Sequence, residues 1–308
     1  MNDGALWDHS RHWLNIRPIY AFGEWVLDSM PLFVGYGITW GVTEVAYHFS
    51  PDQRAGIEAN VRQVLSHTQP GLPQADLDRQ VKKLVYRIFH NRGVWFADLS
   101  LMAGRRQVSG LFNFKKTGNW EALQRQLATG RGAIVASAHL GNWHGGGVAM
   151  ARAGVPVRVV MYKNHAGDVM DQKVARRAKV RQTYITSDPL SMMEVVRALR
   201  SGEVLAMLVD KPWDSRSVAV PFFGKPSHFP VGPVRVARLA NVPIFPAFCV
   251  WKKPREYEAI LCDPIEVGRG DPEQAEFEAI SKIAKVIETQ VAGNLPVWFN
   301  FTPAWSPS

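Results

Sequence analysis

Between residues 132 and 262, short apolar runs alternate with longer amphipathic segments, and this alternation restricts the possible folds more than any other feature of the chain. Short apolar runs are typical of strands that are buried on both faces, and the periodic segments between them are typical of helices. The alternation therefore predicts an α/β fold, with a mostly parallel central sheet flanked by helices. The predicted strands cover residues 133–138, 157–162, 184–186 and 204–209, and the predicted helices between them cover 145–153, 168–181 and 191–200.

His139 lies where the first of these strands ends and a glycine-rich helix begins, in the sequence AHLGNWHGGG of residues 138–147. Ligands of such sheets bind beyond the carboxyl ends of the strands, so a histidine here can reach a substrate. The first amides of a helix have no intrahelical partner and its dipole favours negative charge, which predicts an anion site beside the imidazole. A general base next to donors for an oxyanion suits acyl transfer. The alternative for His139 is a structural role, as a helix cap or a hydrogen-bonded core residue.

The chain has a formal net charge of +9, which predicts an anionic partner. Nucleic acid, an anionic lipid and an acidic carrier protein all carry suitable charge. The sequence has no zinc-finger spacing, no basic heptad helix and no RNA-binding aromatic motif, so nucleic acid is not expected as a partner. Arg176, Arg177, Lys179 and Arg181 place positive charge along the predicted helix 168–181, either as a solvated face or as a site for a carrier protein or a lipid headgroup.

Residues 29–43 are uncharged and rich in apolar side chains, although Pro31 and several glycines interrupt them. The stretch is too short to cross a bilayer, which takes about 20 apolar residues. Trp40 lies in this stretch and Trp25 and Tyr47 lie near it, and such rings favour the headgroup level of a membrane. The pattern predicts a helix that lies in the membrane interface. The alternative is a helical hairpin that packs on the core of the protein itself.

The cysteines and the first residues indicate the cellular setting. Only two cysteines occur, Cys249 and Cys262, so a disulfide framework is excluded and a reduced compartment is expected. The N-terminus has acidic residues and no apolar run of a secretory signal, which predicts a cytoplasmic location. We expect two parts, an N-terminal helical, membrane-associating segment at residues 1–65 and an α/β domain at residues 66–308.

Several blocks follow the His-Leu-Gly-Asn-Trp sequence of residues 139–143 in a fixed order. They are an apolar run that ends at Asp210, a Val-Pro-Phe-Phe-Gly loop at 220–224, a Gly-Pro helix start at 232–233 and a Val-Pro strand start at 242–243. Together these blocks resemble the bacterial lipid A biosynthesis acyltransferase family, within the lysophospholipid and glycerolipid acyltransferase superfamily. The resemblance covers roughly residues 20 to 300.

The resemblance implies both a fold and an activity. The fold is glycerolipid-acyltransferase-like, with a hydrophobic helical N-terminal extension, at the cytoplasmic face of the inner membrane as a peripheral or monotopic protein. The activity is transfer of a fatty acyl chain from an acyl thioester, on acyl carrier protein or CoA, to a hydroxyl or amine of a lipid or glycolipid. His139 would be the general base, and no bound cofactor is expected.

The chain departs from the family at the position of the acidic partner. The family motif has Glu or Asp five positions after the histidine, a position that is His144 here. A histidine supplies no fixed negative charge, so three alternatives stay open. His144 orients His139 as a neutral acceptor, Asp210 supplies the carboxylate from an adjacent strand end, or the transferase activity has been lost. We favour Asp210, with Asp214 and Glu194 as weaker candidates.

Further residues are candidates for binding the substrates. Lys211, where the family has Gln, and Arg158 could stabilise the thioester oxyanion or a phosphate, or could be exposed strand-end cations. The aromatic residues Phe222 and Phe223 with Gly224 could form a wall of an acyl groove, or could pack in the core. Asn142 could hold the loop of His139 or donate to the substrate.

The sequence disfavours a metal site and a serine hydrolase. His139 and His144 have no third and fourth ligand at a recognisable spacing, so no metal is expected. A serine hydrolase is disfavoured because the Gly-x-Ser-x-Gly motif is absent. The remaining alternatives keep the fold: an acyltransferase for an unusual secondary-metabolite lipid, and a catalytically inactive lipid-binding or scaffold protein.

Overall fold

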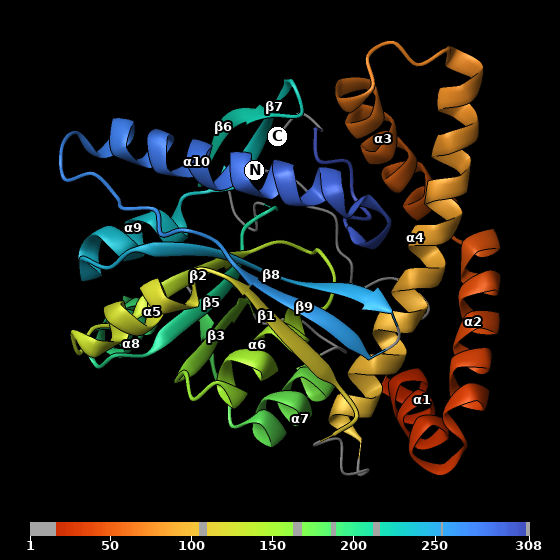
Figure 1. Ribbon diagram of the computed structural model, residues 1–308, viewed down its shortest axis with the longest axis horizontal. Coiled ribbons are helices and arrows are strands. Elements are labelled where there is room, and N and C mark those ends of the chain that lie inside the picture. The colour runs from red at the N-terminus through yellow and green to blue at the C-terminus, as the bar shows by residue number, and fades with distance from the viewer. Residues whose placement is uncertain are drawn as a thin grey trace, which may run out of the picture.

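A seven-stranded sheet forms the centre of the protein, with strand order β1-β9-β8-β2-β5-β3-β4 (Figure 1). The computed structural model describes residues 17–104, 110–162, 168–185, 189–211, 216–253 and 255–305. Neighbouring strands in this sheet are parallel, except for the antiparallel pair β8 and β9. The predicted fold class is therefore confirmed. The strands are β1 (Asn113–Gly118), β2 (Ala133–Ser137), β3 (Val157–Tyr162), β4 (Arg181–Ile185), β5 (Val204–Leu208), β8 (Ile244–Lys253) and β9 (Glu256–Leu261).

Helices cover both faces of the sheet. Val135 of β2 packs in one apolar cluster with side chains of α5 and α6, whereas Ile134 and Ala136 belong to a second cluster with α8, α9 and α10. Because both faces are buried, the central strands are continuous apolar runs rather than alternating ones. The helices on these faces are α5 (Trp120–Ala128), α6 (Trp143–Arg152), α8 (Pro189–Arg200), α9 (Gly232–Ala240) and α10 (Pro272–Gly293).

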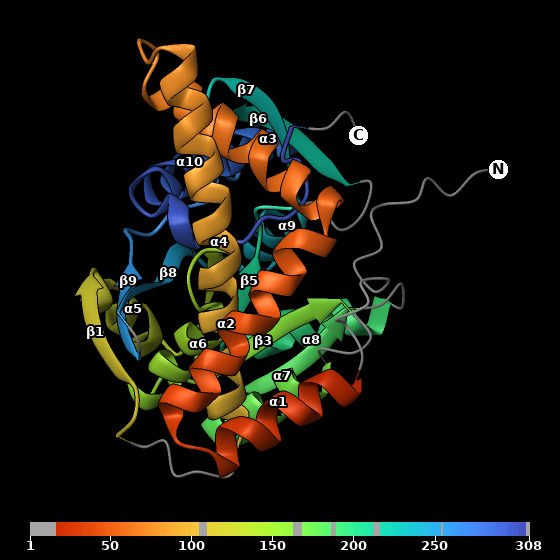
Figure 2. The ribbon, with the colours of Figure 1, turned by 90° about the vertical axis from the view of Figure 1, so that its right-hand side faces the viewer.

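Four N-terminal helices form a layer beside the sheet (Figures 1 and 2). They are α1 (Arg17–Ser29), α2 (Leu32–Phe49), α3 (Pro51–Thr68) and α4 (Gln74–Ala103). Proline stands just before α2 and α4 and at the first position of α3, where its fixed φ and absent N–H do no harm to a helix. The long helix α4 contacts α1, α2, α3 and α7 (Asp168–Ala178). The helical layer thus extends to Ala103, and the predicted division between residues 65 and 66 falls inside α3.

No helix in the part of the chain that the structure describes is long and apolar enough to span a membrane. Pro31 lies between α1 and α2, so only Ser29 of the uncharged stretch belongs to α1, and residues 32–43 lie in α2.

The predicted helix 168–181 is shorter in the structure. α7 ends at Ala178, Lys179 has a positive φ of 57°, and Arg181 begins β4, where Thr183 is buried. The left-handed backbone at Lys179 ends the helix and turns the chain into the sheet. The basic residues therefore do not share one helix face, and Arg181 forms an ion pair with Glu203.

A small antiparallel hairpin and a short 3-10 helix complete the fold. The hairpin consists of β6 (Ser217–Phe222) and β7 (Lys225–Pro230), and the 3-10 helix η2 covers Leu295–Val297. Cys249 is buried in β8 and Cys262 follows β9, and both are free thiols.

Candidate active site

The loop between β2 and α6 carries His139 and is held on several sides. Gly141 has a φ of 66°, and a Cβ added there would lie 2.1 Å from the carbonyl oxygen of Cys249, so only glycine fits. The amide of Gly141 donates to the carbonyl of Val297 (2.8 Å), and the amide of Phe299 donates to the carbonyl of His139 (2.7 Å). These bonds from the C-terminal segment fix the backbone at the carboxyl end of β2.

His139 and Asp210 form a hydrogen-bonded pair. The ring Nδ1 of His139 lies 2.7 Å from Oδ1 of Asp210, and the backbone N–H of His139 donates to Oδ2 of the same carboxylate (3.0 Å). The indole N–H of Trp298 also donates to Oδ2 (3.2 Å). Asp210 follows β5, which is parallel to and adjacent to β2, so the two strand ends bring these residues together. Asp210, the favoured alternative, is therefore in direct contact with His139.

The electrostatics of the pair favour an ionised carboxylate. Burial by itself raises the pKa of Asp210, whose side chain is only 1% exposed. The His139 ring, the His139 backbone N–H and the Trp298 indole lower that pKa by more, so the net pKa lies below the ordinary value. An ionised Asp210 accepts the Nδ1 proton of a neutral imidazole, which leaves Nε2 as the basic nitrogen.

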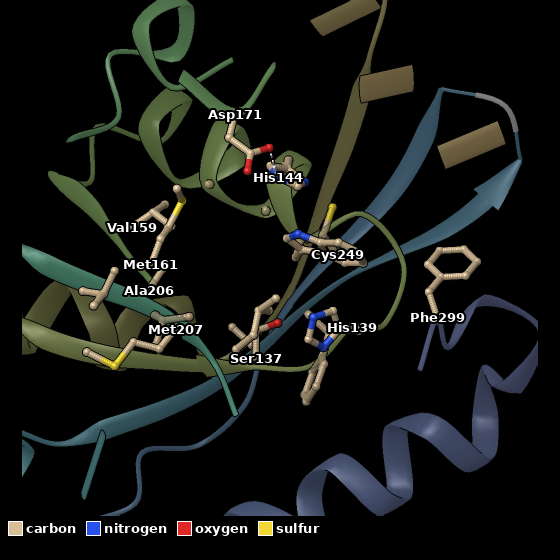
Figure 3. Close-up of a pocket in the computed structure, with 18 of the residues that line it drawn as sticks. Ser137, His139, His144, Val159, Met161, Asp171, Ala206, Met207, Cys249 and Phe299 are labelled. Atoms are coloured by element: carbon tan, nitrogen blue, oxygen red, sulfur yellow. Dashed lines mark hydrogen bonds and ion pairs between the residues drawn. The ribbon is translucent and has the colours of Figure 1, made fainter. Parts of the chain in front are cut away.

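His144 contacts a different carboxylate. Its Nε2 lies 2.8 Å from Oδ1 of Asp171 on α7, and its ring packs against the rings of Trp95 and Trp143 (Figure 3). No hydrogen bond between His144 and His139 is present, so the structure does not support the prediction that His144 orients His139. Asp171 was not anticipated, because no local pattern in α7 distinguishes it from a surface carboxylate.

A large apolar pocket opens beside His139 and contains the His144–Asp171 pair (Figure 3). Its volume is about 710 Å³, within the usual range for small-molecule sites. One part follows the sheet face beneath α6, where the strands contribute small or apolar side chains. These are Val135, Ser137, Val159, Met161, Ala206, Leu208, Ala247 and Ala259. The pocket therefore has polar groups at one place and a long apolar surface elsewhere.

Four cationic side chains also line the pocket. Lys211, which follows Asp210 directly, is one of them, and burial lowers its pKa to about 8 although the Asp210 charge raises it. Arg92 of α4 stacks on the Trp95 ring at 3.5 Å. The other two are Arg216 and Arg235. Only Lys211 was predicted, because the arginines come from elements that tertiary packing alone brings to the pocket.

Arg158 lies away from the pocket, contrary to its predicted role. It stands near the amino end of β3, in register with Leu205 of β5, whereas His139 and Asp210 lie beyond the carboxyl ends of their strands. Its guanidinium bonds to Glu203, Glu194 and Thr183. Glu194, a weaker candidate for the partner of His139, is thus bonded to Arg158 instead. Asp214, the other weaker candidate, lies outside the described residues.

Phe222, Phe223 and Gly224 form the turn of the β6–β7 hairpin rather than a wall of the pocket. Phe223 and Gly224 have φ values of 48° and 77°, the positive values that a two-residue hairpin turn requires. Phe222 and Phe223 are fully buried, and the ring of Phe222 packs against Trp298 and Trp305. The prediction of a groove wall is therefore not supported, and the loop is connected to the site through Trp298, whose indole donates to Asp210.

Asn142 is buried and caps α6. Its side-chain Oδ1 accepts from the backbone N–H of Gly145 (2.8 Å), and its backbone N–H donates to the carbonyl of Cys249 (2.8 Å). Of the two predicted roles, these contacts correspond to holding the loop and not to donation to a substrate. The amides of residues 139, 141, 142 and 145 all have acceptors within the protein. The predicted anion site at the first amides of α6, which begins at Trp143, stays a prediction.

Comparison with known proteins agrees with this geometry. The sequence matches the family described as bacterial lipid A biosynthesis acyltransferase over residues 5–306. Phosphatidylinositol mannoside acyltransferases from two strains of Mycobacterium tuberculosis each share 23% sequence identity with the chain, over 93% of this chain and 87% of the relative. A phosphatidylinositol mannoside acyltransferase from Mycolicibacterium smegmatis shares 22% identity, over 60% of this chain and 59% of its own. The resemblance is confirmed, and the chain belongs to this family of lipid acyltransferases.

Proposed function

We propose that the protein transfers a fatty acyl chain from an acyl thioester, carried by acyl carrier protein or CoA, to a hydroxyl or amine of an anionic lipid or glycolipid. The observation that carries this proposal is the His139–Asp210 pair at the edge of a large apolar pocket. A base held by a buried carboxylate activates a hydroxyl, and an apolar pocket accepts a hydrocarbon chain.

The reaction follows from the proton positions in this pair. Nε2 of His139 takes the proton of the acceptor hydroxyl while the hydroxyl oxygen attacks the thioester carbonyl. The C–O bond forms, the tetrahedral oxyanion collapses, and the C–S bond breaks. The imidazolium then gives its proton to the leaving thiolate, so that no proton is gained or lost. Asp210 stabilises the imidazolium and keeps Nδ1 protonated throughout.

Lys211 is our candidate for stabilising the oxyanion or a phosphate. It lines the pocket next to Asp210, and its pKa of about 8 leaves it mostly cationic at neutral pH. A cation in a largely apolar pocket interacts with developing negative charge more strongly than in water. Phosphate groups of the donor or acceptor are matched by the cationic lining of Arg92, Lys211 and Arg216, whereas Arg235 is paired with Glu276.

The part of the pocket beneath α6 is our candidate for the acyl chain. Replacing Ala206 by Leu fills space on the sheet face, so we expect the longest accepted chain to become shorter. Each methylene that no longer fits loses about 0.8 kcal/mol of burial, or roughly fourfold in kcat/KM. Competition among acyl thioesters of increasing length measures this shift. Ala219→Leu, on the exposed edge of β6, is the matched control and should leave the chain-length profile unchanged.

The outer face of α2 is our candidate for membrane contact. Exposed large apolar side chains gather on this helix, which lies in front of α4 in Figure 2. They are Phe33, Ile38, Trp40, Val42, Val45 and Phe49, and Trp25 of α1 is exposed as well. A monomer rarely exposes this many large apolar side chains of one helix to water, and interfacial helices bury such side chains at the headgroup boundary.

The double variant Phe33→Glu and Phe49→Glu tests this contact. The two rings are 78% and 72% exposed, so we expect folding to be unaffected while binding to anionic phospholipid vesicles falls on the order of a hundredfold. Vesicle co-sedimentation measures binding, and thermal unfolding reports stability. Met193→Glu on α8, 57% exposed, is the control that should bind normally. Unchanged binding of the double variant would assign α2 to contact with something other than a membrane.

The class of acceptor lipid is proposed from the relatives of the chain. The curated relatives are phosphatidylinositol mannoside acyltransferases, so a phosphate-bearing glycolipid is the acceptor class we propose to test first. Transfer of a radiolabelled acyl group from acyl carrier protein or CoA to extracted lipids, with and without protein, tests the function. A labelled lipid that is not a glycolipid would indicate an unusual acceptor. No labelled product with either donor would favour a lipid-binding or scaffold protein.

A further inference from the structure

Asp98 is a fully buried carboxylate of α4 that the proposed reaction does not use. The hydroxyl of Tyr36 on α2 donates to its Oδ1, and the hydroxyl of Tyr257 on β9 donates to its Oδ2. A buried carboxylate is costly unless it is hydrogen-bonded, and here the two phenols and a backbone hydrogen bond from Arg255 stabilise it. This network lies between the helical layer and the sheet, because its members come from α2, α4 and β9.

The network continues from Tyr257 to the loop of His139. Nδ2 of Asn142 donates to the hydroxyl oxygen of Tyr257 (3.3 Å), and Oδ1 of Asn142 accepts from the amide of Gly145 (2.8 Å). Asn142 is the N-cap of α6 and lies three residues after His139. A continuous chain of hydrogen bonds therefore joins Asp98 to the residue that ends the His139 loop.

The donors and acceptors in this chain determine how the Asn142 amide is oriented. An ionised carboxylate only accepts, so both phenol protons point to Asp98. The Tyr257 oxygen is then left as an acceptor, which requires the NH₂ group of Asn142 on that side. The amide oxygen must face Gly145, where it caps the helix. Without a fixed acceptor at Asp98, Tyr257 could donate to the amide oxygen, and the cap would be lost.

The titration behaviour of these groups is consistent with that assignment. Burial raises the pKa of Asp98, while the two tyrosines and Arg255 lower it, and the result is about 6. Burial and the Asp98 charge raise the pKa of Tyr36 and Tyr257 above the usual range of a phenol. At neutral pH the carboxylate is therefore ionised and both phenols keep their protons.

We propose that Asp98 is a positioning residue for acyl transfer, which holds the Asn142 cap and thereby the His139 loop through Tyr257. The test of this proposal by acyl-transfer rates rests on the proposed function. Asp98 touches no reacting atom, and neither Asp98 nor Tyr257 lines the large pocket. The position of His139 should therefore depend on the network while substrate binding should not.

The variants Tyr257→Phe and Asp98→Asn, singly and together, test the proposal. Tyr257→Phe keeps the ring but removes the acceptor for Asn142, so kcat should fall about tenfold with KM within about twofold. Asp98→Asn leaves one acceptor oxygen for two phenols, so the Tyr257 orientation is no longer unique and kcat should fall as well. The double variant should be no slower than Tyr257→Phe alone, because Asp98 acts through Tyr257.

Tyr86→Phe is the matched control. The Tyr86 hydroxyl donates to Glu44 (2.9 Å), so it also joins α4 to α2 through a tyrosine and a carboxylate, but this bond has no connection to Asn142. Its kcat should equal that of the unmodified protein. Losses that multiply in the double variant, a rise in KM without a fall in kcat, or an unchanged kcat in Tyr257→Phe would each overturn the proposal.

A measurement without substrate separates this inference from the proposed function. In ¹⁵N-labelled protein the ring nitrogens of His139, assigned with His139→Ala, should shift in Tyr257→Phe and not in Tyr86→Phe. If the unmodified protein transfers no acyl group, the proposed function fails, while these signals still decide whether the network positions His139. Unchanged His139 signals in Tyr257→Phe would overturn the positioning role even where the turnover of this variant falls.

Discussion

Replacing His139 by alanine is expected to reduce acyl transfer by about 10²- to 10⁴-fold, the usual contribution of a general base. No other imidazole among the described residues is hydrogen-bonded to Asp210, so nothing nearby takes over its proton transfer. The pocket that receives the acyl chain stays the same, so KM for the thioester should change little. The measurement is steady-state transfer of a labelled acyl group.

The same substitution has a predictable cost in stability. Asp210 loses its ring partner but keeps the backbone N–H of residue 139 and the indole of Trp298. We expect the free energy of unfolding to fall by about 1–3 kcal/mol, with the protein still folded. His228→Ala on β7 is the control, because that ring bonds to Ser217 in the hairpin and does not line the pocket. Turnover of His139→Ala at the normal rate would end the general-base assignment.

Asp210→Asn is expected to reduce turnover by up to about 10⁴-fold, because it reverses the tautomer of His139. Two N–H donors, the His139 amide and the Trp298 indole, point at Oδ2 of Asp210. The asparagine oxygen should take that position, since an NH₂ group there would face two donors. The NH₂ group then donates to Nδ1 of His139, which moves the ring proton to Nε2 and removes the base.

His144→Ala should cost much less, about tenfold or below. Its ring bonds to Asp171 and not to Asp210, so its loss leaves the His139 tautomer unchanged. Comparing kcat of the two variants under the same conditions decides between the alternatives for the partner of His139. If His144→Ala proved the slower enzyme, the partner of His139 would have to be sought at position 144 despite the geometry.

The sheet and its helices were predictable from the sequence because local patterns specify them. The apolar runs at 133–138 and 204–209 became β2 and β5, since strands buried on both faces must be apolar throughout. The contact of His139 with Asp210 followed from the same reasoning, because the carboxyl ends of adjacent parallel strands lie together. Both residues were therefore close in the fold although far apart in the chain.

The predictions that failed concern where a residue lies along its strand and which way its side chain faces. Arg158 was assigned to the site from its strand, but it lies near the opposite strand end and bonds to Glu203. For Phe222 and Phe223 the sequence allows a groove wall or core packing, and the hairpin turn directs both rings into the core. An apolar wall of a pocket and an apolar core have the same composition, so the sequence alone does not distinguish them.

The sequence by itself determined the α/β fold, the place of His139 at a strand end and the membership of a lipid acyltransferase family. Only the tertiary structure decided that Asp171 faces His144, that Arg92 reaches the pocket and that Asp98 is joined to Asn142 through Tyr257. The physical reason is the range of the interactions. Periodicity and strand ends are local properties of a chain, whereas these contacts depend on how the helices α4 and α7 pack against the sheet.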